Sequence, residues 1–174
     1  IFSGSRGISI VTLDPQTGQT IFQTTYDTYG SDTASEDLVH DLNECADGTI
    51  VLAAIRDDGS ARLSDAAVTT LQNCGSQSID DLAFRDSWAF IGRKNDTTTV
   101  YEQHTLKSTG QAAVSAFVEF RGTAQEFTAA FRAENLNIST FIVFEESSIR
   151  TPQLVNQDHF RNPLHHPARY LIIT

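Results

Sequence analysis

One short stretch of the sequence, residues 82–94, places an arginine, an aspartate and the chain's only tryptophan within four positions: Arg85, Asp86 and Trp88. An arginine fork and a carboxylate beside an aromatic ring can hold sugar hydroxyls and cover the C–H face of a pyranose. The structural alternative is that Arg85 and Asp86 pair with each other or with turn backbone, while Trp88 fills the core. The flanking apolar positions alternate as in a half-buried strand, so we expect Trp88 in the core.

The remaining residue patterns argue against catalysis and metal binding. A hydrolase needs a positioned acid–base pair or a nucleophile with its base, and neither a Gly-x-Ser-x-Gly elbow nor a P-loop occurs. Three histidines, His159, His165 and His166, lie near the C-terminus, but no cysteine or carboxylate spacing completes a zinc set. We expect no enzymatic activity, metal or cofactor.

The composition excludes two classes of partner. The 174 residues carry a net charge of -10 and no basic run, so nucleic acid and anionic membrane surfaces would repel the chain at long range. No apolar run approaches the roughly 20 residues that span a bilayer. The sequence contains no methionine, so we expect a processed product from which a secretory signal could have been removed.

Two further features favour the secretory pathway. Cys45 and Cys74 lie at the ends of two predicted helices, so they are a candidate disulfide; the alternative is two buried thiols. Asn95 and Asn137 each begin an N-glycosylation sequon. The sequence therefore favours a glycoprotein that is secreted or lies in the lumen of the secretory pathway.

Strand patterns dominate the first part of the chain. Residues 7–13 and 20–26 are rich in β-branched residues, and the turn at 14–18 contains a proline that presets φ and a glycine that accepts positive φ. This predicts a hairpin. Residues 49–55 are apolar without alternation, which is typical of a strand buried on both faces.

Two helices are predicted between these strands and the central stretch. Thr33 and Glu36 form a candidate capping box, which predicts a helix over 34–45. Ser64 or the residue after it can cap a second helix over 65–74.

The second half of the chain shows weaker patterns. A polar loop is expected after Lys94, and Thr123 and Glu126 offer another capping box, with an apolar stripe that predicts a helix over 123–131. Further strands are predicted at 114–120, 138–144 and 169–173, with a long surface loop at 152–167.

Eight motifs follow one another in a fixed order through residues 6–104: Arg6-Gly7-Ile8, Leu13-Asp14-Pro15-Gln16-Thr17-Gly18, Tyr26-Asp27-Thr28-Tyr29-Gly30, Asp47-Gly48-Thr49-Ile50-Val51-Leu52, Asp57-Asp58-Gly59, Gly75-Ser76, Phe84-Arg85-Asp86-Ser87-Trp88-Ala89-Phe90-Ile91-Gly92 and Glu102-Gln103-His104. Together they resemble the GG domain, also called the ILEI domain, over a little more than half of the chain. The resemblance implies an α+β fold, a compact sandwich of two mostly antiparallel β-sheets with short flanking helices. We expect this domain over 1–120, followed by a strand and helix extension over 121–174.

The resemblance also implies a ligand site. In a glycosyltransferase of this family, the similar domain binds β-linked N-acetylglucosamine through an aspartate and an arginine, which by motif correspond to Asp57 and Arg85. The aromatic residue before that arginine is tryptophan there and Phe84 here, which offers a smaller stacking surface. With Asp86, these residues form the expected ligand site. The alternatives are an Asx turn at Asp57 and a buried ion pair of Arg85 with Asp57 or Asp86.

We therefore expect a non-catalytic, secreted or lumenal lectin-like module that binds a glycan. One alternative is a protein-binding module, either a cytokine-like ligand or a subunit of an extracellular assembly. Another is an accessory domain of a larger glycan-processing enzyme.

Overall fold

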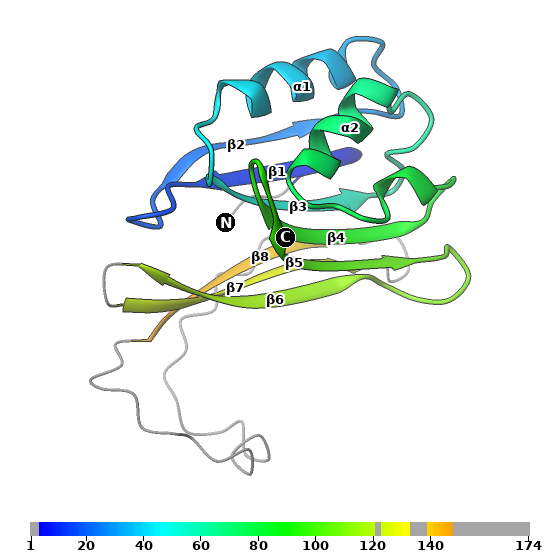
Figure 1. Cartoon of the computed structure of the whole chain (residues 1–174). Helices are drawn as coiled ribbons and strands as arrows, with labels where there is room; N and C mark the ends of the chain where they lie inside the picture. The colour runs from blue at the N-terminus through cyan, green and yellow to red at the C-terminus, as the bar shows by residue number, and fades with distance from the viewer. Residues whose placement is uncertain (1–3, 121–122, 133–138, 148–174) are drawn as a thin grey trace.

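The computed structural model describes residues 4–120, 123–132 and 139–147. Five strands form one antiparallel sheet in the order β2-β1-β3-β4-β5 (Figure 1). Their bounds are β1 (Gly7–Leu13), β2 (Thr20–Tyr26), β3 (Ile50–Arg56), β4 (Ser87–Arg93) and β5 (Asp96–Thr105). Strands β1 and β2 form the predicted hairpin, in which Asp14 accepts hydrogen bonds from the backbone N–H groups of Gln16 and Thr17 at 2.9 and 2.7 Å.

Two helices and one 3-10 turn connect these strands: α1 (Ala34–Glu44), α2 (Asp65–Asn73) and η1 (Ile79–Asp81). The predicted cap of α2 is confirmed, because the Ser64 hydroxyl accepts from the backbone N–H of Ala67 at 3.2 Å. The predicted capping box of α1 is wrong. Thr33 precedes the helix, but its backbone is already in the right-handed region, and its hydroxyl makes no cap bond and instead donates to Asp37.

Strands β1 and β3 are buried on both faces. All of β1 is buried, and in β3 only Arg56 is partly exposed, as the unbroken apolar run predicted. One face packs against both helices in a cluster that includes Ile8, Ile10, Leu38, Leu42, Val51, Leu71, Trp88 and Phe90. The opposite face forms a second cluster of Val11, Leu13, Ile50, Leu52, Ile91 and Ala116.

A second antiparallel sheet consists of β6 (Ala113–Phe120), β7 (Thr123–Arg132) and β8 (Ser139–Ser147), in that order. Strand β6 contacts β4 and β5, and β7 contacts β3 and β4. The α+β class is confirmed, while the sandwich arrangement stays a prediction. The expected division into 1–120 and 121–174 falls between β6 and β7, which pair along their length, and it too stays a prediction.

Two local predictions are wrong. Residues 123–132 form strand β7 instead of a helix, because period-two spacing of Phe127, Ala129 and Phe131 fits a strand and the segment pairs with strands on both sides. The polar loop expected after Lys94 is a tight hairpin, since β5 already begins at Asp96. The strand predicted at 138–144 is β8.

Several predicted features lie outside the described residues. These are the sequon at Asn137, the loop at 152–167, the strand at 169–173 and the three histidines near the C-terminus, His159, His165 and His166. No helix within the described ranges is long and apolar enough to cross a membrane.

Candidate functional site

Two loops meet where β3 ends and β4 begins, because these strands run antiparallel and adjacent. Asp57 directly follows β3, and Arg85 lies two residues before β4. The Nε atom of Arg85 is 3.3 Å from Oδ1 of Asp57. The arginine side chain is 53% exposed and the aspartate side chain 35%, so the pair is open to solvent instead of buried.

Both members of this pair have a left-handed backbone, with φ of 60° at Asp57 and 61° at Arg85. Aspartate tolerates this region, but for arginine it costs about 1–2 kcal/mol. Neighbouring hydrogen bonds hold each turn: the Asp58 carboxylate accepts from the backbone and the hydroxyl of Ser60, both at 2.8 Å, and the N–H of Asp86 donates to the Ala83 carbonyl at 3.0 Å. Backbone strain of this kind persists where the surroundings impose it, and it concentrates at binding sites.

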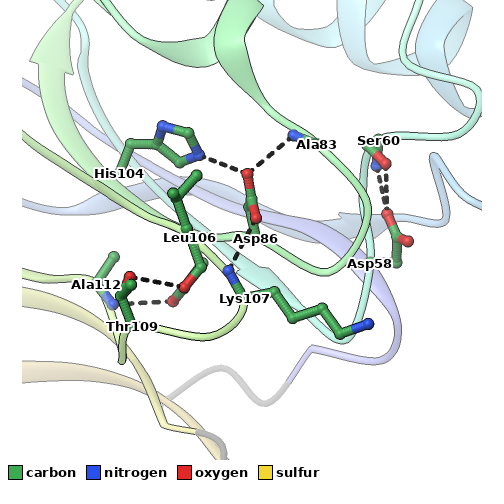
Figure 2. A network of polar contacts seen from close by, with 10 residues as sticks. Asp58, Ser60, Ala83, Asp86, His104, Leu106, Lys107, Thr109 and Ala112 are labelled. Atoms are coloured by element: carbon green, nitrogen blue, oxygen red, sulfur yellow. Dashed lines mark hydrogen bonds and ion pairs between the residues drawn. The ribbon is translucent and has the colours of Figure 1, made fainter.

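Asp86 lies beneath the surface and joins two loops (Figure 2). It is 5% exposed, and its carboxylate accepts from the backbone N–H groups of Ala83 at 3.2 Å and Lys107 at 2.9 Å. Nε2 of His104 lies 2.9 Å from the same carboxylate. Burial alone would raise the pKa of Asp86, but the hydrogen bonds from Lys107, His104 and Ala83 outweigh it and lower that pKa. With these partners, Asp86 positions the loop that carries Phe84 and the loop after β5.

Phe84 is 52% exposed and lies among cationic and aromatic groups. The guanidinium carbon of Arg85 is 5.4 Å from its ring centroid, and Nζ of Lys107 is 5.0 Å from it. The ring of Tyr29 lies at 6.4 Å, tilted by 41°. We call Tyr29, Asp57, Phe84 and Arg85 the platform: an aromatic surface beside an exposed ion pair.

The loop that carries Tyr29 is fixed by an ion pair. Arg6 donates to both carboxylate oxygens of Asp27, at 2.9 and 2.6 Å, and its guanidinium lies 4.7 Å from the Tyr29 ring centroid. The same carboxylate accepts from the backbone N–H of Gly30 at 2.9 Å. The hydrogen bonds from Arg6 hold the pKa of Asp27 below its ordinary value. Both charges are therefore engaged within the protein, which orients Tyr29 toward Phe84.

Trp88 belongs to the core, as predicted. Its side chain is fully buried and stacks on Phe90, with ring centroids 5.5 Å apart and planes 7° from parallel. The indole Nε1 donates to Glu102 at 2.7 Å, and the same carboxylate accepts from Ser76 and from the backbone N–H of Gln77. Glu102 of β5 therefore links Trp88 of β4 to the segment that follows α2.

The other predicted site residues lie away from the platform. Asn95 is exposed at the hairpin tip at the opposite end of β4, where its amide donates to Asp47 at 2.6 Å. Cys45 and Cys74 are buried free thiols at the ends of α1 and α2, so the candidate disulfide is not formed in the structure. Burial raises the pKa of both thiols, and that of Cys74 to about 12.

Sequence reasoning missed two side chains next to the predicted site. Tyr29 lies within a quoted motif, but nothing in its spacing linked it to Phe84. Lys107 follows β5 in a turn without any recognisable motif. Strand pairing brings both side chains to Phe84. Lys107 follows β5, which pairs with β4, and Tyr29 follows β2, which ends at the same end of the sheet where β4 begins.

The groups of the platform can make three kinds of contact. A carboxylate accepts from two hydroxyls, a guanidinium donates to hydroxyl or carbonyl oxygens, and exposed rings cover C–H groups. The combination suits a polar, ring-shaped molecule such as a sugar.

Three relatives of known name each match more than half of the chain. A human "Cell migration-inducing and hyaluronan-binding protein" is 34% identical over 126 residues, which cover 71% of this chain and 9% of that protein. Human Protein FAM3C is 38% identical over 100 residues, covering 57% of this chain and 43% of the relative. Mouse Protein FAM3D is 35% identical over 99 residues, covering 56% and 44%. The chain thus spans less than half of the length of each of these relatives.

The family comparison covers strands β1 to β4 and the platform. The model of the family described as "Interleukin-like EMT inducer" matches residues 6–96, more than half of the chain, and this range includes every platform residue. The resemblance inferred from the eight motifs is confirmed: the chain belongs to the interleukin-like EMT inducer, or ILEI, family.

Proposed function

We propose that this chain is a non-catalytic, lectin-like module that binds a glycan at the platform. The Asp57–Arg85 pair carries the proposal, because both residues hold a left-handed backbone and both side chains are accessible to solvent, Arg85 to 53% and Asp57 to 35%. A strained, accessible pair of opposite charges offers an acceptor and a donor in fixed positions.

Each platform group has a distinct role in this proposal. Asp57 accepts hydrogen bonds from two sugar hydroxyls, and Arg85 donates to a ring substituent or an N-acetyl carbonyl. The exposed part of Phe84 packs against the C–H face of the sugar. Asp86 does not touch the ligand and positions Phe84 and Arg85 through its buried hydrogen bonds. One sugar makes few contacts, so we expect dissociation constants of about 1 µM to 1 mM.

An affinity measurement with one variant tests the proposal. Immobilised glycans that include β-linked N-acetylglucosamine are presented to the wild type and to Arg85→Ala. We expect the variant to bind about tenfold or more weakly, because it loses a charge-assisted hydrogen bond. Arg93→Ala is the matched control, since Arg93 lies at the end of β4 that is opposite Arg85, and its guanidinium donates to the carbonyl of Gly48 at 3.4 Å.

The controls separate recognition from folding. Circular dichroism must show all three proteins folded, and Arg93→Ala must keep the wild-type affinity. A folded wild type that binds no glycan contradicts the proposal, as does equal binding by wild type and Arg85→Ala.

A protein-binding role is the second candidate. Phe84 and Leu106 are large apolar residues that are 52% and 56% exposed. Leu106 directly precedes Lys107, whose ammonium contacts the Phe84 ring. Aromatic, arginine and apolar side chains of this kind anchor protein interfaces. Leu106→Ser distinguishes the candidates: loss of a partner protein with unchanged glycan binding would favour the protein role.

We further propose that the chain acts outside the cell or in the secretory lumen. Asn95 is exposed within its sequon, and its side-chain amide, which donates to Asp47, lies at the protein surface where a glycan can be attached. The human relative of which 9% is matched shows that a similar segment occurs within a much longer protein, which supports an accessory role in a larger assembly. Expression in cultured animal cells followed by N-glycosidase digestion tests this proposal. We expect the protein in the medium to lose mass on digestion, and an unchanged mass would contradict glycosylation at Asn95.

A further inference from the structure

We propose that Lys107 makes the platform selective for acidic saccharides, by pairing with a carboxylate or sulfate on the bound sugar. The inference rests on the proposed glycan-binding function and adds the chemical class of the ligand and the residue that selects it.

The position of Lys107 is fixed at its backbone. Its N–H donates to the buried carboxylate of Asp86 at 2.9 Å, and the same carboxylate holds the loop before β4 through Ala83. The side chain of Lys107 leads away from this anchor (Figure 2). Its Nζ atom lies 5.0 Å from the Phe84 ring centroid. A charged group therefore lies over the aromatic ring against which the sugar would pack.

The ammonium of Lys107 has no carboxylate partner in the part of the chain that the structure describes, in contrast to the neighbouring arginines. Arg85 pairs with Asp57 at 3.3 Å, and Arg6 pairs with Asp27 at 2.6 Å. Among the described residues, no carboxylate lies within ion-pair distance of the Lys107 ammonium; the carboxylate of Asp86 meets its backbone instead. Within that part of the chain, the ammonium beside the platform therefore has no ion-pair partner, on a protein whose net charge is -10.

This charge distribution favours one kind of ligand. The acidic remainder of the protein repels anions at long range, so any preference for an acidic sugar has to come from a local contact. An anionic group placed beside the Lys107 ammonium gains an ion pair that a neutral sugar cannot make, while Asp57, already paired with Arg85, opposes it little. An exposed pair of this kind changes affinity by about fivefold.

The test compares three oligosaccharides of equal length by calorimetry. One contains only N-acetylglucosamine, one alternates N-acetylglucosamine with glucuronate, and one carries sulfates on otherwise neutral sugars. The wild type, Lys107→Gln and Lys107→Arg are measured at low and high salt. Lys94→Gln is the charge-matched control, because Lys94 lies at the opposite end of β4 and binds the carbonyls of Asn43 and Cys45.

We expect the wild type to bind an acidic oligosaccharide about fivefold more tightly than the neutral one, with a preference that declines at high salt. In Lys107→Gln the ratio of the two affinities falls to about one, whereas Lys107→Arg and Lys94→Gln retain it. The glucuronate and sulfate arms show which anion is preferred.

Two results would overturn the inference alone: equal affinity of the wild type for neutral and acidic sugars, or a preference that survives in Lys107→Gln. Equal affinity would leave the glycan-binding function intact. Absence of binding to all three sugars by folded wild type would overturn both.

Discussion

Arg85 and Asp57 form an ion pair with 3.3 Å between Nε and Oδ1, and both residues hold a left-handed backbone. The pair joins the end of one central strand to the approach to the next. A strained backbone at such a site lowers the free energy of unfolding while it fixes the positions of donor and acceptor, and the loss of stability can be measured.

The backbone cost at Arg85 predicts an order of stability between two variants. Arg85→Ala and Arg85→Gly both remove the guanidinium and differ only in the backbone. Because φ is 61°, we expect the glycine variant to be more stable by about 1 kcal/mol. Urea denaturation measures the free energies of unfolding, and an alanine variant as stable as the glycine variant would show that this backbone is not strained.

Asp86→Asn tests the support beneath the platform. An asparagine side chain has only one acceptor oxygen, so one of the N–H groups of Ala83 and Lys107 would face an amide donor. We expect the free energy of unfolding to fall by about 2 kcal/mol and glycan affinity to fall with it. The account of Asp86 is wrong if the variant keeps full stability.

Low pH should weaken the fold through two carboxylates. The pKa values of Asp27 and Asp86 are both lowered in the folded protein, so their contribution is complete above the pKa of an unfolded aspartate, about 3.9. It is lost as the pH falls through their folded pKa values. We expect the free energy of unfolding to decline below about pH 4, and less steeply in Asp86→Asn. Equal slopes in acid titrations monitored by urea denaturation would exclude Asp86 as a contributor.

The two thiols give a direct readout of cysteine state. Burial raises the pKa of Cys74 to about 12, so few thiolates form at neutral pH. We expect Ellman's reagent to react slowly with folded protein and to detect both thiols after unfolding without reductant. Detection of no thiol in the unfolded protein would instead establish the bridge between Cys45 and Cys74.

Trp88→Phe separates the core from the site. The change removes the hydrogen bond to Glu102 and leaves space around Phe90, so we expect a loss of about 2 kcal/mol in stability. Glycan affinity should stay at the wild-type value at temperatures where the variant is folded. Weak binding by a fully folded variant would place Trp88 in the ligand site.

Much of the fold could be predicted because its patterns are local. The apolar run of β3 and the hydroxyl cap of α2 depend on neighbouring residues, and both are found. The helix prediction for residues 123–131 was wrong because their apolar positions fit both helical and strand spacing. Pairing with β6 and β8 decides for the strand.

The candidate site was predictable only in part. The resemblance indicated Asp57, Phe84 and Arg85, which the structure brings together. The contacts of Lys107 and Tyr29 with Phe84 depend on strand order, which no local pattern encodes. The left-handed backbone of Arg85 also has no signal in residue type, since arginine rarely adopts it.

The most direct test of the central claim is a titration of isotope-labelled protein with a β-linked N-acetylglucosamine oligosaccharide, followed by amide chemical shifts. The account predicts that the shifts change in a saturable manner around Asp57, Phe84 and Arg85 and stay constant around Asn95, at the far end of β4. A folded protein whose shifts do not change, or change only away from these residues, would contradict it.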